Sequence, residues 1–175
     1  VSSDDDEILA SVSDYPVMSD SKRPGKFSND HATVTEVLKY EVRKLAKRNL
    51  YFNVVWQMSS FAFLLSCSDL EKFALQARDI PKDGLLIGLL PFPAPIDWAL
   101  QKTVNGEVKP TNEAALTSPS QNFGKYFYDS GAIAVFKGSV FNDNEFKLSS
   151  LKLFGQEIAP FKAVDVDDLQ DILML

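Results

Sequence analysis

The sequence GLLIGLLPF, at residues 84–92, is a continuous apolar run. A strand that is covered on both faces, as in a parallel sheet, is apolar throughout instead of alternating with polar residues. Shorter apolar runs at residues 53–58 and 132–136 predict further strands. Apolar residues at helical spacing predict helices over residues 33–49 and after a cap at Ser68. The alternation of helices and strands predicts an α/β protein with a mainly parallel sheet.

One antiparallel element interrupts this pattern. Residues 99–108 predict a hairpin that turns at Asn105-Gly106, because Asn-Gly favours a two-residue hairpin turn. We expect the hairpin to belong to an insertion over about residues 99–125 within a single domain, since 175 residues fit one domain.

Composition limits the classes of partner. The net charge is −6 and the pI is about 4.8, which argues against a nucleic acid or an anionic membrane as the main partner. A single cysteine, Cys67, excludes an internal disulfide, so we expect a reducing, cytoplasmic location. We expect Cys67 to be a small buried or loop residue just before a helix. The longest apolar run is far too short to span a bilayer.

Two aspartates near the end of the chain, in AVDVDDLQDI at residues 163–172, have a spacing typical of a metal site. On a strand, Asp165 and Asp167 would lie on the same face, where their carboxylates repel each other unless a cation such as Mg²⁺ lies between them. Asp167 and Gln170 also match a helix capping box. The residues alone leave both interpretations open.

The predicted helix over residues 33–49 begins with a capping box at Thr33 and Glu36 and carries basic residues between its apolar positions. We interpret them as the solvated face of the helix and not as a phosphate site. We interpret His31, the only histidine, as a loop or capping residue and not as a general base. The basic residues concerned are Lys39, Arg43, Lys44, Lys47 and Arg48.

Six short motifs, taken in order along the chain, resemble those of the acylneuraminate and pseudaminate cytidylyltransferases. The first three family motifs are V-S-T-D, R-P-x-x-L-x-x-D-x-A and L-Q-P-T-S-P. The fourth is a proline-rich segment before a hairpin, and the sixth is D-I-D. The fifth is H-D-A-G-Q in the pseudaminate branch and N-G-A-I in the sialic-acid branch, and the sequence here is intermediate between the two. Their counterparts here are VSSD at residues 1–4, RPGKFSNDHA at 23–32, QMSS at 57–60, PFPAP at 91–95, YDSGAI at 128–133 and DVD at 165–167.

The resemblance implies a fold of the nucleotide-diphospho-sugar transferase type and a homodimer. It also implies transfer of CMP from CTP to a nine-carbon sugar acid with release of pyrophosphate. Mg²⁺ would be held by Asp165 and Asp167. Nucleotide-binding residues would be Ser2, Asp30, Ala32 and Thr33, and substrate-binding residues would be Gln57, Ser59, Asp129, Ser130 and Gly131. A Gln amide can donate to and accept from sugar hydroxyls, and a glycine lets the backbone approach a bulky ligand.

The sequence also departs from the family pattern. The Gly-rich, basic loop that cradles the triphosphate in the family has no counterpart, Phe61 replaces a proline, and Val34 stands where the family has a serine. We therefore expect either that an N-terminal segment is missing or that the protein is a degenerate member. One alternative is a non-catalytic homologue that dimerises or binds sugar. A further alternative is a nucleotide-sugar glycosyltransferase that uses DVD with Mn²⁺.

Overall fold

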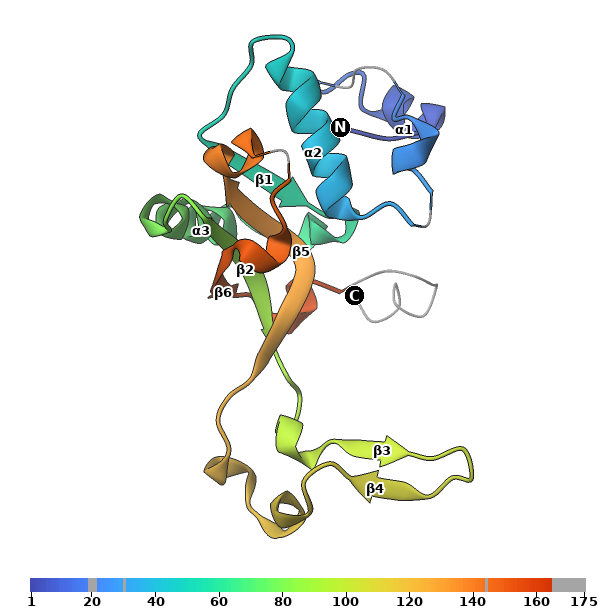
Figure 1. Cartoon of the computed structure of the whole chain (residues 1–175), viewed down its shortest axis with the longest axis vertical. Coiled ribbons are helices and arrows are strands. Elements are labelled where there is room, and N and C mark those ends of the chain that lie inside the picture. Colours follow the sequence, from blue (N-terminus) through green and yellow to red (C-terminus); the bar gives the residue numbers. More distant parts are fainter. Residues whose placement is uncertain (19–21, 30, 144, 165–175) are drawn as a thin grey trace. The chain divides into compact units, whose positions relative to one another are not determined.

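The computed structural model describes residues 1–18, 22–29, 31–143 and 145–164, and its fold is mixed α/β (Figure 1). The chain forms two compact units. The first contains Val1–Val55 and Lys137–Leu151, and the second contains Trp56–Phe136 and the segment that begins at Lys152. The α/β class is as predicted, whereas the single domain stays a prediction. No helix in these described ranges is long and apolar enough to cross a bilayer.

The first unit is built on helix α2 (Val34–Ala46), and it also contains α1 (Asp6–Ser11). The predicted capping box at the start of α2 is confirmed: the Glu36 backbone N–H donates to Thr33 Oγ1, and the Thr33 N–H donates to the Glu36 carboxylate. One side of α2 packs against the short helix η6 (Gly138–Asn142). Lys39 on α2 donates to the carbonyl of the buried Phe146 at 2.6 Å, which further ties α2 to this segment.

The second unit is organised around a four-stranded sheet in the order β1-β5-β2-β6, and the boundary between the units runs through β1 and the end of β5. The strands are β1 (Val54–Met58), β2 (Gly84–Pro91), β5 (Phe127–Lys137) and β6 (Lys152–Glu157). Strand β2 is parallel to β6 and antiparallel to β5, so the sheet is mixed and the prediction of a mainly parallel sheet holds only in part.

The core of the second unit lies between the sheet and helix α3 (Cys67–Asp79), which packs against β2. Phe73 on α3 is completely buried. Leu85 and Leu86, which point to opposite faces of β2, are both buried as well, and this explains why residues 84–92 are apolar on both faces. Strand β6 was not predicted, because its sequence KLFGQE is short, mostly exposed and only weakly apolar.

Two expectations about the start of α3 were wrong. The helix is capped by Ser66 and not by Ser68, because Ser66 Oγ accepts from the Asp69 N–H while the Asp69 carboxylate accepts from the Ser66 N–H. Cys67 is the first residue of the helix and is exposed, not buried and not in a loop.

The predicted hairpin is confirmed as β3 (Leu100–Lys102) and β4 (Val108–Pro110), but its turn is not the expected two-residue Asn-Gly turn. The loop is longer, because the Thr103 N–H donates to the Glu107 carbonyl and the Gly106 N–H donates to the Thr103 carbonyl, and within it only Gly106 is left-handed, at φ +84°. The hairpin lies beyond the ends of β2 and β5 (Figure 1). Next to it, Trp98 donates its indole N–H to the carbonyl of the buried Ala115 at 3.0 Å and packs edge-on against Phe123. This segment therefore has a small core of its own.

An ion pair joins the end of β6 to α3. Lys162, in the short helix η8 (Pro160–Lys162), donates to the Asp69 carboxylate, and both side chains are largely buried. The ammonium of Lys162, together with the Ser66 hydroxyl, lowers the pKa of Asp69 to about 2. Because the folded-state pKa lies below the ordinary value of 3.8, the ionised carboxylate stabilises the fold.

We expect Lys162→Met to raise the pKa of Asp69 and to lower the free energy of unfolding at pH 7 by about 1–2 kcal/mol. The stabilisation is complete above the ordinary pKa of 3.8 and is lost as the pH falls toward about 2, so the variant and the wild type should converge over that interval. Urea unfolding between neutral pH and the acid limit measures this. Lys152→Met is the matched control, because its ion pair with Asp83 is exposed and should leave the unfolding curve almost unchanged. If Lys162→Met lowers the free energy of unfolding by the same amount at every pH, Lys162 contributes through packing only.

Candidate functional site

Strand β5 is irregular where it passes the middle of β2. Ile87 pairs with Ala134 and Leu89 pairs with Asp129, so two steps along β2 correspond to five steps along β5. Strand β5 therefore accommodates three additional residues opposite Gly88. A bulge of this kind redirects side chains and is frequent beside functional sites.

Gly88 provides the space for this bulge. An ideal Cβ atom at Gly88 would lie 2.7 Å from Ser130 Oγ and 2.5 Å from Ile158 Cδ1, which are distances that a carbon atom does not tolerate. With any larger residue at this position, Ser130 or Ile158 would have to shift. An isolated glycine inside an apolar run is a sequence signal for a bulge or a close approach, and Gly88 was not among the predicted site residues.

Ser59 connects the end of β1 to the bulge. Its backbone N–H donates to the Ala132 carbonyl at 2.9 Å, and its hydroxyl donates to the Gly131 carbonyl at 2.6 Å. The half-buried Gln57 donates its side-chain amide to Ser59 Oγ at 3.1 Å. The amide oxygen of Gln57 has no hydrogen-bond partner among the residues that the structure describes, and it can accept from a ligand.

Gly131 forms the exposed tip of the bulge. Its φ of +67° lies in the left-handed region, and its N–H donates to the Asp129 carboxylate at 2.9 Å. Ser130 Oγ accepts from the Ala132 N–H at 3.2 Å. The five residues predicted to bind substrate, Gln57, Ser59, Asp129, Ser130 and Gly131, are thus joined in one hydrogen-bonded cluster. Phe61 lies beside it, 3.6 Å from where a Cβ of Gly131 would be.

The chain end that leads to the predicted metal ligands approaches this cluster. Helix η8 packs against η2 (Ser60–Leu64), the short helix that directly follows Ser59. The next residue after η8, Ala163, is buried, and neither it nor Val164 is in a strand. Asp165 and Asp167 lie outside the described residues, so the metal site stays a prediction. Within the described ranges, no three His, Cys, Asp or Glu residues are grouped so that they could hold a metal ion.

The residues predicted to bind the nucleotide belong to the first unit, and hydrogen bonds already engage them. The Ser2 hydroxyl donates to Glu41 on α2 at 2.6 Å. The Thr33 hydroxyl is engaged in the α2 capping box, and the Ala32 N–H donates to the Asn29 carbonyl at 3.0 Å. Asp30 lies outside the described residues. Between described residues, no hydrogen bond joins Ser2 to Ala32 or Thr33.

Arg23 joins the first two motifs of the resemblance. Its backbone N–H donates to the Ser3 carbonyl at 2.8 Å, and its guanidinium lies 3.4 Å from the Asp4 carboxylate. Its Nε donates to Ser28 Oγ at 3.0 Å. Arg23 thus joins residues 1–4 to residues 23–28 through both its backbone and its side chain, and it was not among the predicted site residues.

We expect Gly88→Ala to lower the free energy of unfolding by about 1–3 kcal/mol, because the methyl group must displace Ser130 or Ile158. Chemical unfolding measures the change. Gly25→Ala is the control, because no atom lies within 4 Å of its added Cβ, and its effect should stay within about 0.5 kcal/mol. Equal effects of the two substitutions would contradict a tight contact at Gly88.

Comparison with known proteins gives a distant relationship. No family model matches the sequence. The sequence is 25% identical over 175 residues to a pseudaminic acid cytidylyltransferase of Campylobacter jejuni, and the alignment covers 98% of this chain and 73% of that protein. The chain is therefore distantly related to the cytidylyltransferases.

Proposed function

We propose that this protein transfers CMP from CTP to a nine-carbon sugar acid and releases pyrophosphate. The main support is the similarity to a pseudaminic acid cytidylyltransferase, which extends over nearly the whole chain. The mixed α/β fold is compatible with a sheet of the nucleotide-diphospho-sugar transferase type, which forms part of the proposal. In the reaction, the anomeric hydroxyl oxygen of the sugar acid forms a bond to the α-phosphorus of CTP. The bond from that phosphorus to the bridging oxygen breaks, pyrophosphate leaves, and the hydroxyl proton passes to solvent.

The cluster at the β5 bulge is the proposed site for the sugar acid. The amide of Gln57 is held by Ser59 and presents its oxygen to a sugar hydroxyl, while the exposed Asp129 carboxylate can accept from another. Because Gly131 has no side chain of its own, the ligand can approach its main chain beside the Phe61 ring. These groups orient the substrate and do not exchange protons with it.

For the nucleotide, we propose a site formed by the segment that includes Ser2, Asp30, Ala32 and Thr33. We propose Asp165 and Asp167 as the ligands of Mg²⁺, because carboxylates are the ligands that Mg²⁺ prefers together with phosphate oxygens. When bound, Mg²⁺ would neutralise the charge that develops on the phosphates. The acidic protein has a particular need for such neutralisation, since its net charge is −6.

We expect pyrophosphate release from the protein only when CTP, Mg²⁺ and a nonulosonic acid are all present. Asp165→Asn should lower turnover by at least about a hundredfold, because it removes charge stabilisation from the transition state. Gln57→Leu should raise KM for the sugar acid roughly tenfold and leave KM for CTP unchanged, because it removes a substrate hydrogen bond. A coupled pyrophosphate assay with pseudaminic and N-acetylneuraminic acids measures both effects.

Asp14→Asn is the control for the charge change, because Asp14 is exposed in a surface turn of the first unit. Turnover that survives replacement of both Asp165 and Asp167 would contradict the metal assignment. Sugar-acid binding without turnover of CTP would support a non-catalytic homologue instead. Preference for a UDP-sugar with Mn²⁺ would support a glycosyltransferase.

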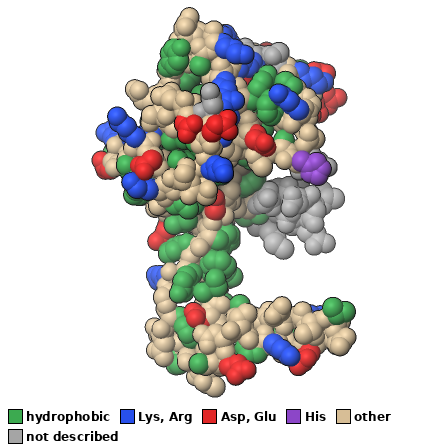
Figure 2. All heavy atoms as spheres, in the orientation of Figure 1, with side chains coloured by type: hydrophobic (Ala, Val, Ile, Leu, Met, Phe, Trp, Pro, Cys, Tyr) green, Lys and Arg blue, Asp and Glu red, His purple; other side chains and the backbone are tan. Residues whose placement is uncertain are grey.

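We further propose that the β3–β4 hairpin forms the interface of a homodimer. Residues that pair directly across a hairpin share one face, so Leu100, Val108 and Pro110 lie together with Lys102, while Gln101 and Lys109 occupy the other face. Leu100 and Val108 are 57% and 49% exposed. Figure 2 shows hydrophobic side chains at the surface of the hairpin tip and along the strands that lead to the hairpin. Exposed apolar surface of this kind marks an association site.

The double variant Leu100→Glu/Val108→Glu should convert the dimer to a monomer, because it places two like charges in each copy of the apolar face. Light scattering after size-exclusion chromatography measures the molar mass. Leu75→Glu is the control, since Leu75 on α3 is exposed to a similar degree, at 58%, and lies outside the hairpin. A monomeric wild-type protein, or a double variant that remains dimeric, would contradict this interface.

A further inference from the structure

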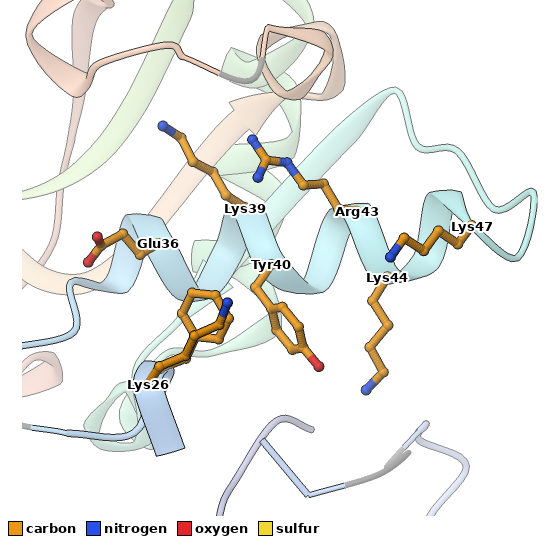
Figure 3. A pocket seen from close by; sticks show the side chains of 8 residues that line it. Lys26, Glu36, Lys39, Tyr40, Arg43, Lys44 and Lys47 are labelled. Carbon is orange, nitrogen blue, oxygen red and sulfur yellow. The ribbon is translucent and has the colours of Figure 1, made fainter. Parts of the chain in front are cut away.

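The first unit contains a groove of about 530 Å³ that the proposed function does not use. Figure 3 shows its labelled side chains on α2 and on η1 (Gly25–Phe27). The α2 residues in the lining have spacings of three and four, so they form one continuous face of the helix. The lining residues are Lys26, Phe27, Glu36, Lys39, Tyr40, Arg43, Lys44 and Lys47.

From the sequence, we interpreted this basic face of α2 as solvated. In the structure, η1 packs beside it and the two together line the groove. Helix η1 places Lys26 and Phe27 beside the face, and the Phe27 ring packs on Tyr40 with ring centres 4.6 Å apart. The basic face of α2 therefore forms one wall of the groove, and η1 forms the other. Its volume lies within the range of small-molecule sites, which is roughly 300–1,000 Å³.

The groove is strongly cationic in an acidic protein. Five of its eight lining residues are Lys or Arg, against one carboxylate, Glu36. That carboxylate is held at the start of α2 by the Thr33 N–H and hydroxyl, so it is already engaged in the helix cap. Lys39 donates to the Phe146 carbonyl and Lys44 lies 3.6 Å from the Glu41 carboxylate, so these partners offset part of the attraction of the two lysines for an anion. Clustered cations of this kind attract an anion that carries several charges.

The aromatic wall adds a second kind of contact. Phe27 and Tyr40 are half-buried and adjacent, and the Lys26 ammonium lies 4.6 Å from the centre of the Phe27 ring. Planar rings next to ammonium and guanidinium groups suit a ligand that combines a flat base with phosphates. The net charge of −6 disfavours a long nucleic acid, whereas a small phosphorylated ligand is compatible with a groove of this size.

We propose that this groove binds a polyphosphate chain, either in a nucleoside triphosphate or as inorganic polyphosphate. The cations would contact the phosphate oxygens, and the Phe27 and Tyr40 rings would contact a base where one is present. The proposal does not depend on the proposed transferase activity, because it concerns binding to side chains of α2 and η1 alone.

The test is isothermal titration of the protein with tripolyphosphate, pyrophosphate and CTP in the presence of EDTA, which silences any Mg²⁺-dependent site. The triple variant Lys26→Gln/Arg43→Gln/Lys47→Gln should bind tripolyphosphate roughly tenfold more weakly, since it loses three cations from the groove. The matched control is Lys72→Gln/Lys125→Gln/Lys147→Gln, which removes the same charge from exposed positions outside the groove. Its affinity should remain within about twofold of the wild type, because salt screens distant charges.

The variant Tyr40→Leu distinguishes a nucleoside triphosphate from inorganic polyphosphate as the ligand. If a base contacts the rings, CTP binds more tightly than tripolyphosphate, and Tyr40→Leu removes the difference. If the two ligands bind equally well, the groove recognises the phosphate chain alone, which also supports the proposal.

Three results would overturn the proposal: absence of tripolyphosphate binding to the wild type, equal weakening in the triple variant and its control, or tighter binding of a short oligonucleotide than of tripolyphosphate. Circular dichroism verifies that each variant is folded. If the triple variant fails to fold, Lys47→Gln alone provides the test, because Lys47 is exposed at the end of α2. That substitution should weaken tripolyphosphate binding about twofold, and an unchanged affinity would contradict the proposal.

Discussion

The close approach of β5 to β2 at Gly88 is the constraint on which the candidate sugar site depends. Without a Cβ atom at this position, Ser130 lies directly over β2, and three additional residues fit into the middle of a regular strand. The bulge in turn places the Gly131 carbonyl where Ser59 can donate to it, and Ser59 positions the amide of Gln57. The absence of a side chain at Gly88 thus leaves room for the bulge at which polar groups of β1 and β5 meet.

Helix α2 organises the first unit, because its different sides contact different segments. One side packs against η6, and the cationic face lines a groove together with η1. Lys39 belongs to the cationic face and also donates to the Phe146 carbonyl. The Ser2 hydroxyl reaches Glu41 on this helix, and Arg23 joins residues 1–4 to the segment around Ser28. The residues predicted to bind nucleotide are therefore integrated into the structure of the unit, where a ligand would have to compete with or extend these hydrogen bonds.

The distant relationship to cytidylyltransferases and the geometry of the second unit are separate lines of support for the proposed function. Gln57 and Gly131, which belong to two different motifs of the resemblance, are 74 positions apart in the sequence. In the structure they are linked through one hydroxyl group. This linkage supports a common binding role for the two residues.

The sequence by itself determined the elements whose signals are local. The apolar residues 84–92 specify β2 through burial, and the capping box at Thr33 specifies the start of α2. Gly106 specifies the hairpin through its left-handed backbone. Strand β6, the antiparallel pairing of β5 and the bulge opposite Gly88 were decided only by tertiary structure, because each depends on which distant segment lies alongside. For the same reason, the basic face of α2 became a groove only when η1 packed beside it.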